Sequence, residues 1–265
     1  MTSYFDTIQR CVEQERPLAT ATVVGGPEQV GARMLVFDDG STEGSLGNPE
    51  LDRRARGDAL AALRRGAPRR TSYPTDGEAS DVFIDVYPSP PTLLIFGGVH
   101  IGIPLARFAK QLGFRVRVID ARGRFANEER FPDADEIVTE YADEYLAKAR
   151  VDSSTYVVVL SHDPKLDDPA LLHVVRTPAR YIGAIGSRTT NEKRRARLKA
   201  EGLPDELLDR IHAPIGLKIG AESPEEIALA IMAEMIAAKN GIDDRPLPEA
   251  AASSQTVSPL PVGER

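Results

Sequence analysis

The sequence predicts an α/β protein in which a small α+β domain precedes a doubly wound parallel sheet. The main observation is an apolar run, Leu93 to Phe96, that ends abruptly in glycine. An amphipathic segment then continues to Gly113, and a second β-rich run, Arg115 to Ile119, follows it. Strand, tight turn, helix and strand in this order form a βαβ unit, the usual opening of a Rossmann-like parallel sheet.

The first third of the chain alternates short β-rich runs with two helical segments. Asn48-Pro49 is placed to start the second helix, and Asp38-Asp39-Gly40 is a strong hairpin turn. Residues 66–80 are rich in Gly, Pro, Ser and Thr and predict an exposed loop. The expected elements are helices over 3–15 and 51–63 and strands over 18–24, 31–37, 41–45 and 82–87.

Three prolines, Pro88, Pro90 and Pro91, form a stiff linker after the last of these strands. We place the domain boundary there, which gives an N-terminal domain over residues 1–88 and a Rossmann-like domain over 89–242. Residues 243–265 contain little to bury, and we expect a disordered tail.

The second domain continues with further strands, each followed by a helix. Thr155 to Leu160 is a continuous apolar run, typical of a strand buried on both faces. We expect the charged run Lys193-Arg194-Arg195 to lie on a solvated helix face. Ser223-Pro224-Glu225-Glu226 is a capping box. Further expected elements are a strand near 136–138, helices from 143, 167, 191 and 224, a strand ending near Gly183, and an ordered loop over 211–220.

Composition excludes several classes of function. The net charge of −7 argues against broad binding to nucleic acid or to an anionic membrane. Cys11 is the only cysteine, so no intrachain disulfide or cysteine-rich metal cluster can form. The N-terminus lacks the features of a signal peptide and no apolar run is long enough for a membrane helix, so we expect a cytoplasmic protein.

The turn after the first parallel strand matches a dinucleotide fingerprint incompletely. G-x-G-x-x-G aligns with residues 97–102, but Val99 stands where the second glycine would let a pyrophosphate approach. Asp120, about 20 residues further on, is placed to reach a ribose hydroxyl. The turn alone leaves two interpretations open: a nucleotide site, or a turn that only packs strand against helix.

Three loops end strands at what should be one edge of the sheet, where α/β proteins bind ligands. Together they offer backbone N–H groups and an arginine suited to an anion. His100 and His162 could transfer protons, ligate a metal or cap loops. A metal site would need a third ligand, for which Asp163 is the candidate, and we assign no metal. The candidate cofactor-binding residues are Gly97, Gly98, His100, Gly102, Asp120, Ser161, His162, Asp163, Gly186, Ser187 and Arg188.

Four segments resemble the XdhC/CoxI family: residues 96–102, 160–168, 181–188 and 211–228. The resemblance covers nearly the whole chain, from about Leu18 to Gly241. It implies an accessory protein that binds molybdenum cofactor, protects it during sulfuration and delivers it to a molybdenum hydroxylase such as xanthine dehydrogenase. It also implies a small first domain and a Rossmann-like second one. A cysteine desulfurase is a candidate second partner and a homodimer a candidate assembly.

The sequence leaves the question of catalysis open between two classes. It contains no G-x-S-x-G, H-E-x-x-H or Walker A motif, which favours a maturation chaperone without turnover. The alternative is an NAD(P)-dependent oxidoreductase that uses Asp120 on the ribose.

Overall fold

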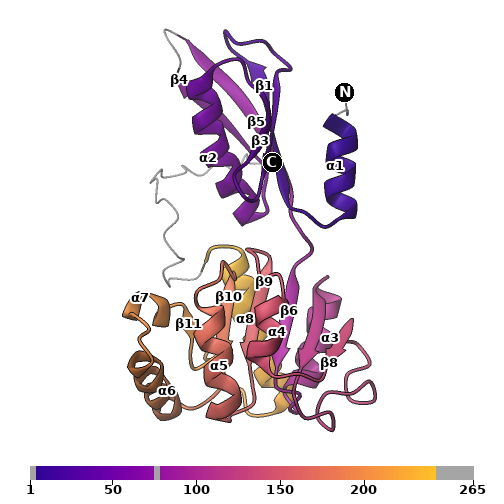
Figure 1. Cartoon of the computed structure of the whole chain (residues 1–265), viewed down its shortest axis with the longest axis vertical. Coiled ribbons are helices and arrows are strands. Elements are labelled where there is room, and N and C mark those ends of the chain that lie inside the picture. Colours follow the sequence, from indigo (N-terminus) through magenta and orange to yellow (C-terminus); the bar gives the residue numbers. More distant parts are fainter. Residues whose placement is uncertain (1–3, 75–77, 243–265) are drawn as a thin grey trace, which may run out of the picture.

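Two β-sheets of different kinds make up the protein, one antiparallel and one parallel, as Figure 1 shows. The computed structural model describes residues 4–74 and 78–242. The expected tail, residues 243–265, lies outside the described residues. The predicted fold class, an α+β part followed by a Rossmann-like parallel sheet, is confirmed.

The first sheet has five strands in the order β3-β2-β1-β5-β4, and every pairing is antiparallel. The helix α2 packs its alanine-rich face on one side, against Val36 and Ile84. The helix α1 covers part of the other side, where Cys11 lies buried against Leu35. The elements are α1 (Tyr4–Glu13), β1 (Leu18–Gly25), β2 (Arg33–Phe37), β3 (Thr42–Ser45), α2 (Pro49–Arg65), β4 (Arg69–Pro74) and β5 (Ala79–Tyr87).

The exposed loop predicted over residues 66–80 is wrong in its central part, because β4 occupies Arg69–Pro74. The strand pairs with β5 along its length, from Arg69 opposite Ile84 to Pro74 opposite Ala79. Only Tyr73 is buried, and its hydroxyl donates to Asp58 at 2.6 Å. An edge strand with one solvated face carries polar residues, so composition alone resembles that of a loop.

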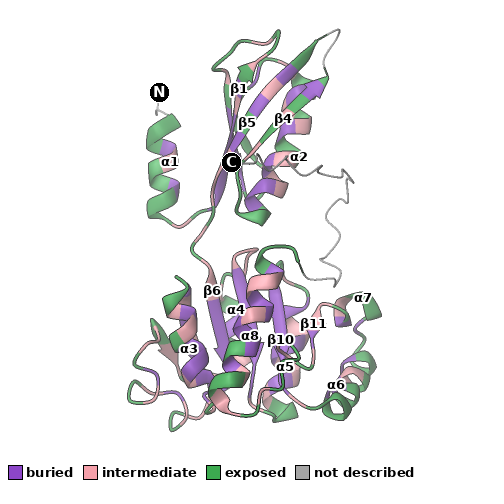
Figure 2. Ribbon diagram, turned by 180° about the vertical axis from the view of Figure 1, so that it is seen from behind, coloured by how far each residue is buried: buried purple, intermediate pink, exposed green. Residues whose placement is uncertain are grey.

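The second sheet has six parallel strands in the order β11-β10-β9-β6-β7-β8. Helices cover both faces, and the sheet between them is buried (Figure 2). The elements are β6 (Thr92–Phe96), α3 (Gly102–Gln111), β7 (Arg115–Ile119), β8 (Glu136–Val138), α4 (Ala142–Lys148), β9 (Thr155–Val159), α5 (Pro164–Val174), β10 (Tyr181–Ala184), α6 (Arg188–Ala200), α7 (Asp205–Leu208), β11 (Ile211–His212) and α8 (Pro224–Lys239).

Three other expectations for this part need correction. The helix expected from Asp167 begins at Pro164, because Asp163 caps it and proline suits its first turn. The loop expected over 211–220 begins with a strand, β11, which pairs with β10. The amphipathic segment expected to continue to Gly113 ends as a helix at Gln111, and the apolar Leu112 that follows is 46% exposed.

Polar contacts join the two sheets across residues 88–91. The carboxylate of Glu15, just after α1, pairs with the guanidinium of Arg115 on β7, at 2.6 Å for one of the two bonds. The backbone oxygen of Glu15 accepts from Ser89 Oγ at 2.7 Å. Arg150 reaches Asp38 at 2.6 Å. These exposed pairs orient the two parts but each contributes little stability.

Asn48 is the N-cap of α2, and its side chain accepts from the backbone N–H groups of Glu50 and Leu51. Asn48→Ala leaves both groups without that partner and should lower the free energy of unfolding by about 1 kcal/mol. Asn48→Ser keeps an acceptor and should unfold like the parent. Urea titration of the three proteins checks this, and equal stability of the alanine and serine variants would contradict it.

Candidate functional site at the carboxyl edge of the parallel sheet

The strand order places several chain reversals at one edge of the sheet. The first strand, β6, lies between β7 and β9, so the chain runs outward in opposite directions from it. A crevice outside the carboxyl ends of such strands is where α/β folds bind ligands. The loops after β6, β9 and β10 share this edge, as predicted.

The two glycines after β6 are required by internal packing. Gly97 has a φ of +102°, and a Cβ there would press against the backbone of Ser161. A Cβ on Gly98 would collide with the carbonyl oxygen of Phe125, in the loop that follows β7. The protein's own backbone therefore lies close to this turn, where a pyrophosphate would have to approach.

Asp120 directly follows β7, is 4% exposed, and already accepts four hydrogen bonds. Its carboxylate accepts from the N–H of Gly98 at 2.9 Å and from the backbone N, Nε and Nη2 of Arg122 at 2.8–2.9 Å. Burial raises the pKa of Asp120, but these hydrogen bonds outweigh burial and hold its pKa below the usual value. Binding a ribose would require Asp120 to release Arg122.

Two further residues of the turn after β6, His100 and Gly102, differ in burial. Gly102 is buried at the start of α3 against the ring of Phe131, while His100 is exposed. The crevice between the ends of β6, β7 and β9 holds a cavity of about 20 Å³. That volume suits about one water molecule, so the crevice is far smaller than the space that a bound cofactor needs.

A buried polar network lies beneath the end of β9. Ser161 Oγ donates to Asp167, and Arg194 Nη2 donates to the other carboxylate oxygen at 3.0 Å. Arg194 also donates to the carbonyl of Ile185 at 2.8 Å and to Asn191. The Arg194 and Asp167 side chains are 4% and 1% exposed. The solvated face expected for Arg194 is therefore wrong, because its guanidinium turns inward to pair with Asp167.

The two residues after Ser161 face solvent. His162 has a φ of +63°, a left-handed conformation that a non-glycine residue adopts rarely and often at functional sites. The side chain of Asp163 caps α5, accepting from Lys165 N at 3.0 Å. Asp163 thus has a structural partner, whereas the exposed imidazole of His162 lies open at the edge.

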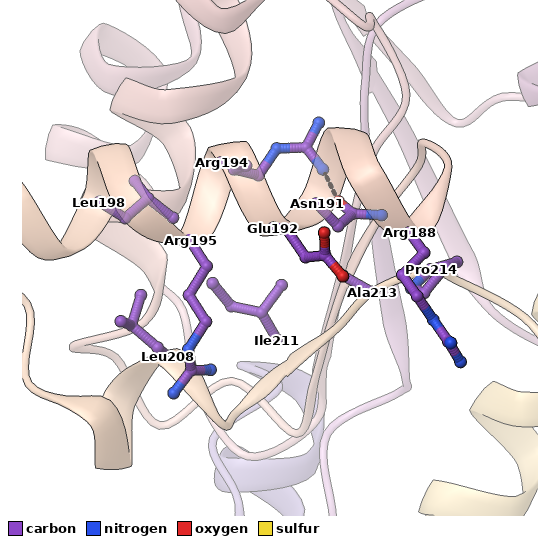
Figure 3. Close-up of a pocket in the computed structure, with 10 residues that line it drawn as sticks. All are labelled: Arg188, Asn191, Glu192, Arg194, Arg195, Leu198, Leu208, Ile211, Ala213 and Pro214. Carbon is purple, nitrogen blue, oxygen red and sulfur yellow. Dashed lines mark hydrogen bonds between the residues drawn. The ribbon is translucent and has the colours of Figure 1, made fainter.

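The loop after β10 forms the N-terminus of α6. Ser187 caps the helix, as predicted, through a bond from Thr190 N at 3.2 Å. Gly186 has a φ of +131°, and its carbonyl accepts from Asn191 at 2.9 Å. Arg188 is exposed and lines a separate pocket beside α6 (Figure 3), which shares no lining residue with the crevice at Gly97.

That pocket lies between α6, α7 and β11 and has a volume of about 270 Å³. Figure 3 shows Arg188 extending toward the end where Pro214 lies, and Arg195 toward the end where Leu208 lies. The structure thus divides the predicted site residues between two places. Gly97, Asp120 and Ser161 line the small crevice, whereas Arg188 lines the larger pocket beside α6.

Sequence reasoning missed a second buried network, on the opposite face of the sheet edge. Glu234 of α8 accepts from Tyr181 Oη at 2.6 Å and from Gly216 N at 2.8 Å, and it lies 3.4 Å from His212 Nδ1. The sequence signal that could have indicated this network is Glu234 itself, a glutamate on the apolar face of a helix. The network holds the loop after β11, whose Ala213 and Pro214 line the pocket.

Within the described residues, no three His, Cys, Asp or Glu side chains group as metal ligands would. No helix in that part of the chain is long and apolar enough to cross a membrane.

Comparison with known proteins decides the family. The model of the XdhC Rossmann domain matches residues 93–235, more than half of the chain. The chain belongs to the XdhC family. The model of the XdhC and CoxI family matches residues 11–74 as well, so both sheets contribute to the match. The resemblance drawn from the sequence is confirmed.

Three curated relatives share this family resemblance. An uncharacterized Escherichia coli protein, YqeB, is 30% identical over 253 residues, which cover 89% of this chain and 46% of YqeB. A Bacillus subtilis protein, described as a probable xanthine dehydrogenase subunit, is 32% identical over 60% of this chain and 46% of its own length. The molybdenum cofactor insertion chaperone PaoD of Escherichia coli is 33% identical over 34% of this chain and 28% of its own length.

The match therefore spans no more than about half the length of these relatives. Among solved structures, a crystal structure described as a xanthine dehydrogenase from Bacillus halodurans superposes with a TM-score of 0.53. The superposition covers 89% of this chain and 96% of that one at 22% sequence identity, and it supports the fold.

The Arg194–Asp167 pair yields a prediction for stability. Arg194→Met leaves the buried Asp167 carboxylate without its cation and should lower the free energy of unfolding by about 3–5 kcal/mol. Burial already raises the pKa of Asp167 despite its donors, and removing Arg194 should raise this pKa further. The loss of stability should therefore grow from pH 5 to pH 8.

Urea unfolding at both pH values checks this prediction. The double variant Arg194→Met/Asp167→Asn should recover part of the stability at pH 8, because no buried charge remains unpaired. A loss below about 1 kcal/mol that does not change with pH would contradict the account.

Glu234 yields a second prediction for stability, from a carboxyl whose pKa is shifted in the opposite direction to that of Asp167. Burial raises the pKa of Glu234, but hydrogen bonds from His212, Tyr181 and Gly216 outweigh burial and lower its pKa to about 2. A carboxyl with a lowered folded pKa stabilises the protein above its unfolded pKa, near 4.5. That contribution is lost as pH falls from 4.5 toward 2.

Glu234→Gln should therefore cost about 3 kcal/mol at pH 7, and the difference from the parent should shrink below pH 4.5. Thermal unfolding between pH 3 and pH 7 measures this, with the exposed Glu129→Gln as control. A difference that stays constant over this range would show that the charge of Glu234 is not what stabilises the loop.

Proposed function

We propose that the protein is an accessory factor that binds molybdenum cofactor as cargo and delivers it to a molybdenum hydroxylase of the xanthine dehydrogenase type. Family membership carries this proposal, together with the 33% identity to an insertion chaperone. Sulfuration of the cargo with a cysteine desulfurase, a homodimeric assembly and a cytoplasmic location complete the proposal.

The chemistry of the carboxyl edge fits such a cargo. Molybdenum cofactor combines a flat pterin ring system with a phosphate, so its seat needs an apolar wall and a cation. The pocket beside α6 offers both, with Leu198 and Ile211 in its wall and Arg188 at its mouth. A guanidinium is a planar, permanently charged donor suited to phosphate. The N-terminus of α6 also favours negative charge.

The geometry does not favour the alternative, an NAD(P)-dependent oxidoreductase. A dinucleotide on the turn after β6 would have to displace the carbonyl of Phe125 from Gly98 and Arg122 from Asp120. The observed packing therefore supports a carrier that holds its ligand elsewhere along this edge.

Retention of the cargo tests the proposal. The purified chain, mixed with molybdenum cofactor released from a hydroxylase, should hold the cofactor back during ultrafiltration and transfer it to cofactor-free hydroxylase. An unrelated Rossmann protein of similar size is the control. Retention no greater than that of the control would sink the proposal, and calorimetry showing micromolar affinity for NAD or NADP would favour the oxidoreductase.

A further inference from the structure

The open pocket beside α6 has an apolar wall and a polar mouth. Leu198 and Leu208 are 1% and 2% exposed and form the back of the pocket, with Ile211 beside them. Pockets that hold drug-sized ligands usually exceed about 300 Å³. At about 270 Å³ this pocket suits one small bicyclic ring rather than a dinucleotide.

Two groups at the mouth are poised for a ligand. Arg188 and Glu192 lie one helical turn apart on α6, and both line the pocket. Opposite charges at this spacing usually attract each other, yet no hydrogen bond or ion pair of either side chain occurs among the described residues. In Figure 3 the carboxylate of Glu192 lies near Ala213, and the guanidinium of Arg188 lies farther away, past Pro214.

The other arginines of α6 are already engaged. Arg195 pairs with Asp205 at 2.9 Å and Asp209 at 2.8 Å, Arg197 pairs with Asp168 at 2.6 Å, and Arg194 is buried against Asp167. The pocket thus combines an apolar slot with one unengaged acceptor and one unengaged cation.

We propose that this pocket binds the 2-amino-4-oxopyrimidine ring of a pterin, with Glu192 as the residue that recognises it. A carboxylate accepts two parallel hydrogen bonds from the adjacent ring N–H and amino group, as carboxylates do from forked donors. The ring lies against Leu198, Leu208 and Ile211, and Arg188 holds the anionic substituent. This inference rests on the proposed function and names the part of the cofactor that the protein recognises, its pterin ring.

A fluorescent pterin tests the assignment on the full chain. The probe is 6-carboxypterin, and its comparison compound is 6-carboxylumazine, which carries an oxygen in place of the 2-amino group. Fluorescence polarisation should give at least tenfold tighter binding of the pterin. Glu192→Gln should abolish that preference, and Arg188→Ala should weaken both compounds at least tenfold.

Matched controls come from the same helix and the residue after it. Glu201→Gln and Lys193→Ala change exposed charges outside the pocket and should leave both affinities unchanged. Arg188 and Glu192 are exposed, so thermal unfolding of their variants should match the parent. Equal binding of the two compounds, or a preference that survives Glu192→Gln, would overturn the inference.

The outcome is separable from that of the proposed function. If the parent and both variants retain molybdenum cofactor equally, the chaperone role stands and the pocket assignment fails. If the pterin binds as expected but the parent retains no molybdenum cofactor, the assignment stands and the cargo was misidentified.

Discussion

The buried ion pair between Arg194 and Asp167 sets the geometry of the whole carboxyl edge. It joins α6 to α5, and Asp167 also accepts from Ser161 at the end of β9. Arg194 fixes the loop after β10 through the carbonyl of Ile185. Because the pair is almost fully enclosed, the helix cannot shift without exposing or orphaning a charge. The pair therefore fixes the position of α6, which forms one wall of the pocket.

The same edge shows why a Rossmann-like topology need not bind a dinucleotide in the familiar place. Gly98 is covered by the backbone at Phe125, and Asp120 is held by Arg122. These contacts use the glycine and the acid of the fingerprint for packing, and the crevice between β6, β7 and β9 holds only about 20 Å³. The larger pocket, of about 270 Å³, lies farther along the sheet, between α6 and β11.

Much of the architecture could be predicted from sequence because its signals are local. The capping box at Ser223 and the apolar run over Thr155–Val159 specify their elements within a few residues. The site was harder, because its decisive contacts are distant in sequence. Nothing near Arg194 indicates that its partner lies 27 residues away, and Glu234 meets Tyr181 across 53 residues. A buried arginine and an exposed one look alike within a basic helix.

Hydrogen exchange of the full chain with and without molybdenum cofactor tests the central claim most directly, which is that this XdhC-family chain holds its cargo beside α6. The account predicts that bound cofactor slows exchange in residues 188–198 and 208–216 and leaves residues 97–102 unchanged. Protection confined to residues 97–102 and 120–126 would contradict it, because the ligand would then lie at the turn after β6, where the crevice holds only about 20 Å³.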